Sequence, residues 1–376
     1  MHYGRLFLLP LLLLSLFEGS WAEDVWVTGR PASAEFLKDV LSRRGWNHYP
    51  TKDLRPGESW KAPDGNLVIN LDWTPPAAAV AALSDHPEDV DRRGLLFSGG
   101  LTPHRTVRFQ YYHLGSLRGS DPGLGLFVSN HGTETARLYL RSAAGRPSLD
   151  YFSTGHTNNV LWLEAEKFGE GEFLDIPAGQ TRIIFRQDMP EEMVVSGTLG
   201  LSQTEGPPLQ FGLLASPDPD DLPALNNLLK ETDVHSRGFY PVATQRVERS
   251  YVVGQQKESR IAVGALRQET FSGVRELRGD YGVVYDVDLE LVNPTEKSVK
   301  IKLLFNPRGG AATGSFLLDE KIVEVPRTEA MTEASIAAWE LPGGTRRKVR
   351  VRTLPEGASS YPVRIILRDD TAKDRL

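Results

Sequence analysis

The chain has 376 residues, of which 40% are hydrophobic and 24% are charged, and its formal net charge is −6. This length is typical of two or three domains with ample material for a buried core. The net negative charge argues against a nucleic-acid-binding protein, whose surface is normally basic. Because the chain contains no Cys, disulfides, thiolate metal ligands and Cys nucleophiles are excluded.

The first 22 residues have the pattern of an export signal. Arg5 supplies a positive charge, residues 6–17 are almost all apolar, and Ser20 and Ala22 place small residues before a cleavage point. The apolar run of about 12 residues is shorter than the roughly 20 that a membrane span needs. We therefore predict cleavage near Ala22, no transmembrane anchor in the mature chain, and a secreted or cell-surface location. A cysteine-free exported chain fits a bacterial envelope best.

Residues 23–85 are interpreted as a small α/β element. Short strands are expected at 25–27 and 67–73. Helical spacing predicts a helix over 33–44, and Pro75-Pro76 favours a second, Ala-rich helix that ends near Leu83.

A first series of β-rich runs follows, separated by Gly, Asp, Asn and Ser. The runs are 106–114, 124–129, 136–141, 160–164, 181–186, 193–201 and 209–214. Short strands at this spacing are typical of antiparallel sheets that cover one another, so residues 86–216 are predicted to form a β-sandwich.

The β pattern is interrupted over 217–247. Leucines from Leu222 to Leu229 recur at helical spacing behind a group of aspartates, which predicts a helical linker. A second strand series follows at 251–253, 260–263, 283–292, 299–305, 315–325, 336–341, 348–352 and 363–367. The expected fold is mainly β: two antiparallel Ig-like β-sandwich domains, the second over 248–376, after a small N-terminal α/β element.

Asp286, Asp288 and Glu290 alternate with apolar residues, so all three carboxylates lie on one face of a predicted strand. Such a row could bind Ca²⁺ through oxygen ligands, or supply the acid and base for glycoside hydrolysis. These three are the candidate catalytic residues.

The next predicted strand carries Ser298, Lys300 and Lys302 between apolar residues. If 293–297 forms a hairpin loop, the lysines lie opposite the three acids on the same face. Cross-strand ion pairs on a solvated sheet surface are therefore the favoured interpretation of the acidic row.

A basic stripe is expected on a later strand, where the alternating residues are Arg346, Lys348, Arg350 and Arg352. One reading is that the stripe binds an anionic envelope component such as teichoic acid or a lipid headgroup. The favoured reading is that it pairs with acids of neighbouring strands.

Three aromatic residues, Tyr112, Trp162 and Trp339, are expected in or beside strands. They could form a platform for sugar rings, although buried aromatic side chains of a sandwich are the more common case. Arg278-Gly279-Asp280 is an integrin-type tripeptide, but Gly followed by Asp serves a turn equally well.

Sequence motifs of metal, nucleotide and hydrolase sites are absent. His104, His113, His131 and His156 show no paired ligand spacing, and neither His-Glu-x-x-His nor Gly-x-Ser-x-Gly occurs. The Gly-rich run at 306–310 lacks the Gly-Lys-Ser/Thr of a phosphate-binding loop. No metal and no cofactor are expected.

Four phrases resemble a group of uncharacterised exported proteins of Gram-positive-type bacteria that are built largely of β-sandwich. They are Tyr111-Tyr112-His113, Gly279-Asp280-Tyr281-Gly282, Asn306-Pro307-Arg308-Gly309-Gly310 and Ser360-Tyr361-Pro362-Val363. The resemblance spans about residues 105–368. It implies an exported location and a β-sandwich fold, and it implies no activity.

The leading functional hypothesis is a non-catalytic surface or cell-wall-associated protein that interacts with a cell-wall glycan or another envelope component. The alternatives are a secreted glycan-acting hydrolase that uses the paired carboxylates, and a calcium-stabilised carbohydrate-binding module. Oligomeric state does not follow from the sequence.

Overall fold

The computed structural model describes residues 59–61, 67–69, 79–117, 122–216, 229, 235–270 and 276–370. These residues form a mainly β protein of sandwich character, as predicted, with one helix among them. The export signal, the helix predicted over 33–44 and all of the linker helix except Leu229 lie outside the described residues. No helix of the described part is long and apolar enough to cross a membrane.

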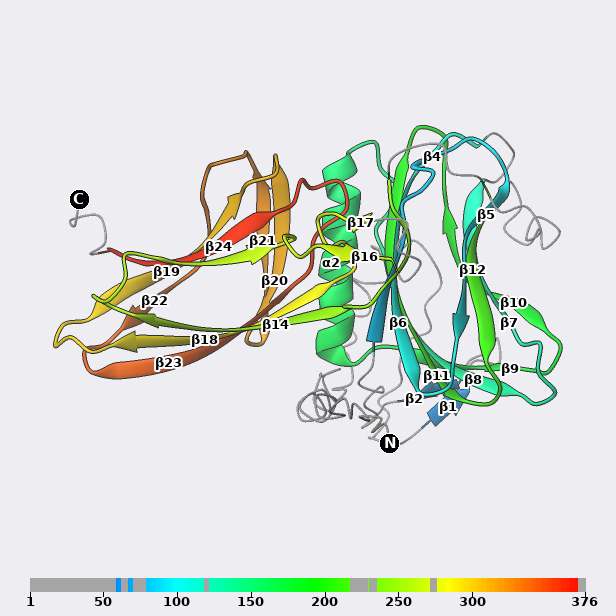
Figure 1. Cartoon of the computed structure of the whole chain (residues 1–376), viewed down its shortest axis with the longest axis horizontal. Coiled ribbons are helices and arrows are strands. Elements are labelled where there is room, and N and C mark those ends of the chain that lie inside the picture. The colour runs from blue at the N-terminus through cyan, green and yellow to red at the C-terminus, as the bar shows by residue number, and fades with distance from the viewer. Residues whose placement is uncertain are drawn as a thin grey trace, which may run out of the picture.

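The first sheet pair consists of a nine-stranded and a four-stranded sheet, on the right of Figure 1. The strand order is β1-β2-β9-β8-β11-β6-β3-β13, with β4 beside β6, and then β10-β7-β12-β5. The bounds are β1 (Ser59–Lys61), β2 (Leu67–Ile69), β3 (Ala79–Ser84), β4 (Asp89–Val90), β5 (Gly94–Leu101), β6 (Arg105–Gly115), β7 (Gly123–Ser129), β8 (Ala136–Ala144), β9 (Glu172–Ile176), β10 (Thr181–Asp188), β11 (Val194–Glu205), β12 (Leu209–Ser216) and β13 (Arg237–Tyr240). Phe97, Phe109 and Phe211 pack together between the two sheets, with ring centroids 4.8 to 5.8 Å apart.

The second sheet pair consists of a five-stranded sheet, β14-β18-β23-β20-β21, and a four-stranded sheet, β15-β24-β19-β22. A two-stranded ribbon, β16-β17, lies beside it. The bounds are β14 (Thr244–Val252), β15 (Ser259–Val263), β16 (Gln268–Glu269), β17 (Glu276–Leu277), β18 (Val284–Asn293), β19 (Val299–Pro307), β20 (Ala312–Leu318), β21 (Lys321–Thr328), β22 (Ala334–Leu341), β23 (Thr345–Thr353) and β24 (Val363–Asp369). Alternate residues such as Val287, Leu289 and Leu291 point into the core between these sheets.

Helix α2 (Tyr151–Phe168) stands between the two sheet pairs (Figure 1). Asp150 caps its start by accepting a hydrogen bond from the Phe152 amide at 3.1 Å, and Gly169, at φ 65°, ends it. The helix packs on β8 and β11 on one side and on β20 and β21 on the other. Since both sides are covered, consecutive residues such as Leu161, Trp162 and Leu163 are all fully buried.

Helix α2 corrects the prediction of a strand over 160–164. A short apolar run is compatible with a buried strand or with a helix that is buried all round, and periodicity cannot separate the two. The Ala-rich helix predicted to end at Leu83 is also wrong, because this segment is strand β3. It runs parallel to β6 and antiparallel to β13, so pairing on both edges overrides the helical preference of Ala.

The predicted boundaries also shift where the chain passes between the sheet pairs. The described parts of the predicted α/β element are strands β1, β2 and β3 of the nine-stranded sheet. The second half of the predicted 217–247 linker holds β13, which belongs to the first sheet pair, and the beginning of β14, which belongs to the second. The chain therefore crosses from one pair to the other between Tyr240 and Thr244.

Both faces of the nine-stranded sheet are buried over much of its area. In β11, every residue from Val194 to Gln203 is buried. One face packs on the four-stranded sheet, while the other lies under α2 and the second sheet pair. Residues such as Thr198 and Ser202 are therefore buried although they are polar, which weakens the alternation expected of a half-exposed strand.

Helix α2 approaches the loop after β23 closely between two glycines. A Cβ added to Gly155 would lie 2.7 Å from the carbonyl carbon of Gly357 and would collide with its oxygen. The helix can thus dock on the loop after β23 only because residue 155 has no side chain.

We predict that Gly155→Ala destabilises the protein by roughly 1–3 kcal/mol, because backbone must shift to admit the methyl group. Urea unfolding monitored by tryptophan fluorescence would measure the loss. Gly100→Ala is the matched control, since Gly100 is exposed on β5 and its added Cβ would lie 4.0 Å from the nearest atom. Equal stability of the two variants would contradict the tight docking.

Candidate functional site: polar networks at the junction

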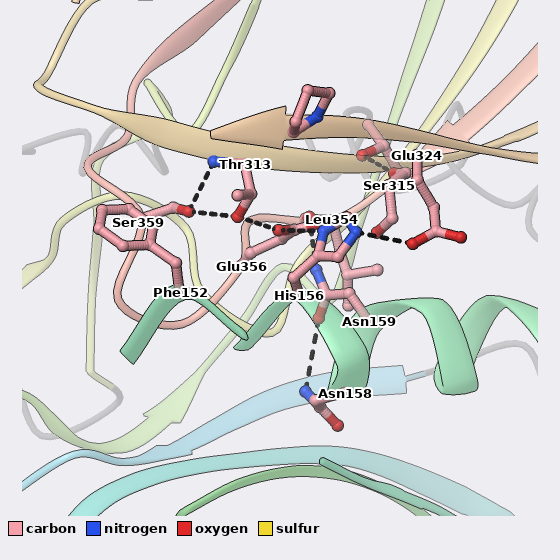
Figure 2. Close-up of polar contacts among 12 residues, drawn as sticks. Phe152, His156, Asn158, Asn159, Thr313, Ser315, Glu324, Leu354, Glu356 and Ser359 are labelled. Carbon is pink, nitrogen blue, oxygen red and sulfur yellow. Dashed lines mark hydrogen bonds and ion pairs between the residues drawn. The ribbon is translucent and has the colours of Figure 1, made fainter. Parts of the chain in front are cut away.

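A network of polar side chains lies at the junction between the two sheet pairs, around α2 (Figure 2). His156, on α2, places Nδ1 3.0 Å from Oε2 of Glu356, in the loop after β23. Its Nε2 lies 2.9 Å from Oε2 of Glu324 on β21. One ring of α2 thereby joins two carboxylates of the second sheet pair.

This geometry requires the protonated form of His156. A neutral imidazole has one N–H donor, whereas here both ring nitrogens face carboxylate oxygens. Burial lowers the pKa of His156, but hydrogen bonds to Glu356 and Glu324 and their charges outweigh it and raise the pKa to about 9. The ring is therefore an imidazolium at neutral pH.

The network continues into the second sheet pair through hydroxyl groups. The Glu356 side chain is fully buried and also accepts a hydrogen bond from Thr313 Oγ1 at 2.5 Å. Thr313 Oγ1 lies 2.9 Å from Ser359 Oγ, which accepts from the Thr313 amide at 3.0 Å. The side chains of Glu356, Thr313 and Ser359 thus form a continuous series of hydrogen bonds (Figure 2).

The hydroxyl of Ser359 and the imidazole of His156 belong to one network, but they do not form a nucleophile–base pair. A base must accept a proton from the nucleophile directly, but Thr313 and Glu356 separate Ser359 from His156. The imidazolium has no free lone pair, and Ser359 is only 2% exposed. The network is arranged to join structural elements.

Two adjacent asparagines on α2 tie the helix to both sheet pairs. Asn158 donates to Thr198 Oγ1 on β11 at 3.0 Å, while Asn159 donates to the Leu354 carbonyl oxygen at 2.8 Å. Because both side chains are fully buried, these hydrogen bonds satisfy groups that would otherwise be desolvated without a partner.

A second buried network is centred on Arg352 of β23. Its guanidinium binds Asp286 of β18 through two hydrogen bonds, of 2.9 and 2.7 Å, and its Nη1 lies 3.4 Å from Glu166 on α2. Burial raises the pKa of Asp286, but the hydrogen bonds and charges of Arg352 and Arg350 outweigh it and keep the pKa below its usual value. Asp286 is therefore ionised and paired.

Trp162 lies between two arginines of the nine-stranded sheet. The guanidinium carbons of Arg108 and Arg141 lie 5.9 and 6.0 Å from its ring centroid, within cation–π range. Arg141 donates to the Glu170 carbonyl oxygen at 2.7 Å, and Arg108 donates to the carbonyl of Ala243, where the chain enters the second sheet pair. Burial lowers the pKa of Arg108 to about 10, against the opposing influence of Glu166.

The acidic row and the basic stripe predicted from the sequence are partners of each other. In the register of β18 and β23, Asp286 lies opposite Arg352, Asp288 opposite Arg350, and Glu290 opposite Lys348. Arg346 also contacts Glu290 at 3.4 Å.

The pairing of the acids with Lys300 and Lys302 is therefore wrong. Residues 294–298 do not close a hairpin. They cross from the five-stranded to the four-stranded sheet, so β18 and β19 lie in different layers. A connection of this length can join two strands of one sheet or two strands of different sheets. The alternation of side chains along the strands does not distinguish the two cases.

The paired acids and cations of β18 and β23 are buried at one end of the two strands and exposed at the other. Asp286 and Arg352 lie under α2 and are buried, whereas Asp288 is exposed and the Arg346 side chain is 72% exposed. Each acid has a cation opposite it in the sheet. Since Asp286 is paired with Arg352 and Glu290 with Arg346, the row does not present the two free carboxylates that glycoside hydrolysis needs.

The three aromatic candidates do not share a surface. Trp162 is fully buried on α2, and Trp339 lies on β22 with Arg347 5.6 Å from its ring centroid. Tyr112, on β6, is half-buried against Gly357 at the junction. Burial also raises the Tyr112 pKa, with smaller contributions from Glu88 and Asp85.

Asp280 of the integrin-type tripeptide is buried. Its Oδ2 accepts hydrogen bonds from the Leu266 amide at 2.8 Å and from the Tyr285 hydroxyl at 2.5 Å. Because burial outweighs these hydrogen bonds, the pKa of Asp280 is raised to about 6. The tripeptide is a structural turn.

The histidines are dispersed in the described structure. His113 is buried between Ser84 Oγ and the Pro87 carbonyl oxygen, at 3.1 and 2.8 Å, and His131 contacts Gln210 at 3.2 Å. Within the described residues, no group of three or more His, Cys, Asp or Glu could hold a metal ion. His156 joins two carboxylates that are 168 and 200 positions away in the chain, so no sequence spacing could have revealed this network.

No protein-family model and no curated protein sequence matches this chain. Among solved structures, the secreted serine protease VesC from Vibrio cholerae is 11% identical, with 69% of this chain and 50% of that chain covered and a TM-score of 0.18. The CUB1-EGF-CUB2 domains of rat MASP-1 are 8% identical, with 74% of this chain and 99% of that chain covered and a TM-score of 0.19. The PBSX exported protein XepA is 8% identical, with 73% of this chain and 86% of that chain covered and a TM-score of 0.16. The chain thus spans half the length of the VesC chain, and TM-scores this low carry no argument about function.

We predict that His156 makes stability depend on pH in the alkaline range. With a pKa of 6.5 unfolded and about 9 folded, its contribution is fully present below pH 6.5 and is lost as pH rises through 9. His156→Gln should remove about 3 kcal/mol at pH 6 and much less at pH 10. Urea unfolding across this pH range measures the free energy of unfolding, with His131→Gln as the control. If the free energies of His156→Gln and of the parent protein changed with pH in parallel, the prediction would be contradicted.

We predict that Asp286→Asn lowers the free energy of unfolding by about 3–5 kcal/mol, because it removes the carboxylate charge that pairs with the buried guanidinium of Arg352. Asp288→Asn, two residues along the same face but exposed, should cost less than about 1 kcal/mol. Chemical denaturation at pH 7 compares the two. A similar cost for both would show that the buried pair is not critical.

Proposed function

We propose that the mature protein is a non-catalytic surface or cell-wall-associated protein, composed of two Ig-like β-sandwich domains and acting as an interaction or structural module. The observation that carries the proposal is the state of the polar groups at the junction. His156, Glu356, Asp286 and Arg352, which have the chemistry of a catalytic site, are all engaged with one another across structural elements.

The same observation weighs against the two alternatives. A hydrolase needs an acid and a base that can exchange protons with substrate, and each candidate acid here has a cation opposite it. A calcium site needs several oxygen ligands free of other cations, whereas Asp286 has both of its oxygens bound by arginines.

The junction also suits a protein that presents surfaces in a fixed arrangement. Ion pairs, buried amides and apolar contacts of α2 connect the two sheet pairs, with Leu161 and Trp162 packed against Val284, Leu317 and Leu354. An interface of this kind limits domain motion. The export signal pattern of residues 1–22 supports a location of these surfaces outside the cytoplasm.

The test is a pull-down of the mature protein with purified cell wall, membranes and insoluble polysaccharides. We expect retention by the cell-wall fraction and N-terminal sequencing that begins at Glu23. An absence of retention by all three fractions would contradict the interaction function.

A parallel assay for release of sugars from the retained fraction tests catalysis. The matched variant is Asp288→Asn/Glu290→Gln, which changes the acids at the solvated end of the stripe and spares the buried pair. Turnover that disappears in this variant would overturn the non-catalytic proposal.

A further inference from the structure

We infer that Asp280 makes the junction between the two sheet pairs pH-sensitive, so that acidification strengthens it. Asp280 lies in the turn before β18 and is 0% exposed. Its Oδ2 accepts hydrogen bonds from the Leu266 amide and the Tyr285 hydroxyl. Its Oδ1 is buried and has no hydrogen-bond partner among the described residues. The fold thus encloses a carboxyl group of which only one oxygen is satisfied.

No cation compensates a negative charge on Asp280. The ionisable groups from the elements around this turn are the hydroxyls of Tyr281, Tyr285 and Tyr361 and the carboxylates of Asp85 and Glu356. Each of them is neutral or negative, and Glu356 is already bound by His156. Two arginines of the adjoining segments, Arg267 and Arg278, have side chains that are 88% exposed and pair with Glu276. In the part of the chain that the structure describes, Asp280 therefore forms no ion pair.

A buried carboxyl group in such surroundings favours its neutral form. Because Oδ2 of Asp280 already accepts two hydrogen bonds, an added proton resides on Oδ1. Burial of a neutral carboxyl group costs less free energy than burial of a carboxylate. Burial accordingly outweighs the two hydrogen bonds and raises the pKa of Asp280 from 3.8 to about 6.

The sign of the pH effect follows from this shift. Folding binds a proton at any pH between the two pKa values, so the stabilisation by the neutral form is fully present below pH 3.8 and is lost as pH rises through about 6. His156 acts in the same direction but between pH 6.5 and about 9. The two titrations therefore occupy separate pH ranges.

The carboxyl group of Asp280 holds the loop between β15 and β16. The Leu266 amide donates to Oδ2 of Asp280 at 2.8 Å. The Tyr285 hydroxyl donates to the same oxygen and accepts from the Gly264 amide at 3.1 Å. A charge on Asp280 therefore acts directly on the attachment of this loop to β18.

The same turn also connects the second sheet pair with the polar network and with the first sheet pair. The Tyr281 hydroxyl donates to the Ser359 carbonyl oxygen at 2.7 Å. A Cβ added to Gly282 would lie 3.5 Å from the Gln110 side chain on β6. Loosening of this turn would thus be transmitted to contacts between the two sheet pairs.

The backbone of Asp280 allows a conservative test. Its φ of 54° lies in the left-handed region, which Asn and Asp adopt more readily than other residues with a side chain. Asn can therefore replace it and imitate the neutral carboxyl group. Asp319 provides the matched control, because it is also a left-handed turn residue, with φ 50°, but is exposed.

The experiment measures urea unfolding of the parent protein, Asp280→Asn and Asp319→Asn from pH 4.5 to pH 8. Between these limits, the folding equilibrium constant of Asp280→Asn should rise about thirtyfold relative to that of the parent protein, because the variant avoids the buried charge. The same ratio for Asp319→Asn should change less than about twofold. An equal change for both variants, or no change for Asp280→Asn, would overturn the inference.

A measurement on the unaltered protein keeps the inference testable if Asp280→Asn does not fold. The ¹³C chemical shift of the Asp280 carboxyl group should titrate with a midpoint near pH 6. A midpoint at or below about pH 4 would show that burial does not disfavour the charge, and would overturn the inference.

Hydrogen exchange of the Leu266 amide tests whether the effect reaches the structure around the turn. After correction for the intrinsic exchange rate, this amide should be about tenfold better protected at pH 5 than at pH 8 in the parent protein. In Asp280→Asn its protection should not depend on pH. The same pH dependence in both proteins would assign the effect to another group and overturn the inference.

Discussion

The structure depends on the burial of α2 on both of its sides. A helix enclosed between sheets has little contact with water, so His156, Asn158 and Asn159 need partners inside the protein. They find them in different sheet pairs, at β11, β21 and the loop after β23. A shifted docking would leave these groups buried and unpaired, which favours a single orientation of the two pairs.

Charge is balanced between neighbouring side chains on both sheets of the second pair. On the five-stranded sheet, the acids of β18 lie opposite the cations of β23, and β14 adds Arg246 and Glu248 to the same face. On the four-stranded sheet, cations of β24 and β19 pair with Glu258, Glu333 and Asp370. The strand order therefore decides which charges meet, and a count of charges in either segment does not.

Strands of the second sheet pair were largely predictable. The runs at 260–263, 299–305 and 363–367 correspond to β15, β19 and β24. Buried and exposed residues alternate along β15 and at the start of β19. In the first sheet pair, the run predicted at 193–201 corresponds to β11, although β11 is buried on both faces. The middle of α2 is buried and shows no clear alternation, so 160–164 was mistaken for a strand, and β3 was mistaken for a helix.

The sequence by itself determined the mainly β character and the placement of acids and cations on particular strand faces, because alternation is a local property of the backbone. Which strands are neighbours was decided only by the tertiary structure. The partners of Asp286 and His156 come from segments far away in the chain, and their selection depends on packing between layers. Candidate residues could therefore be named in advance, whereas their partners, burial and protonation could not.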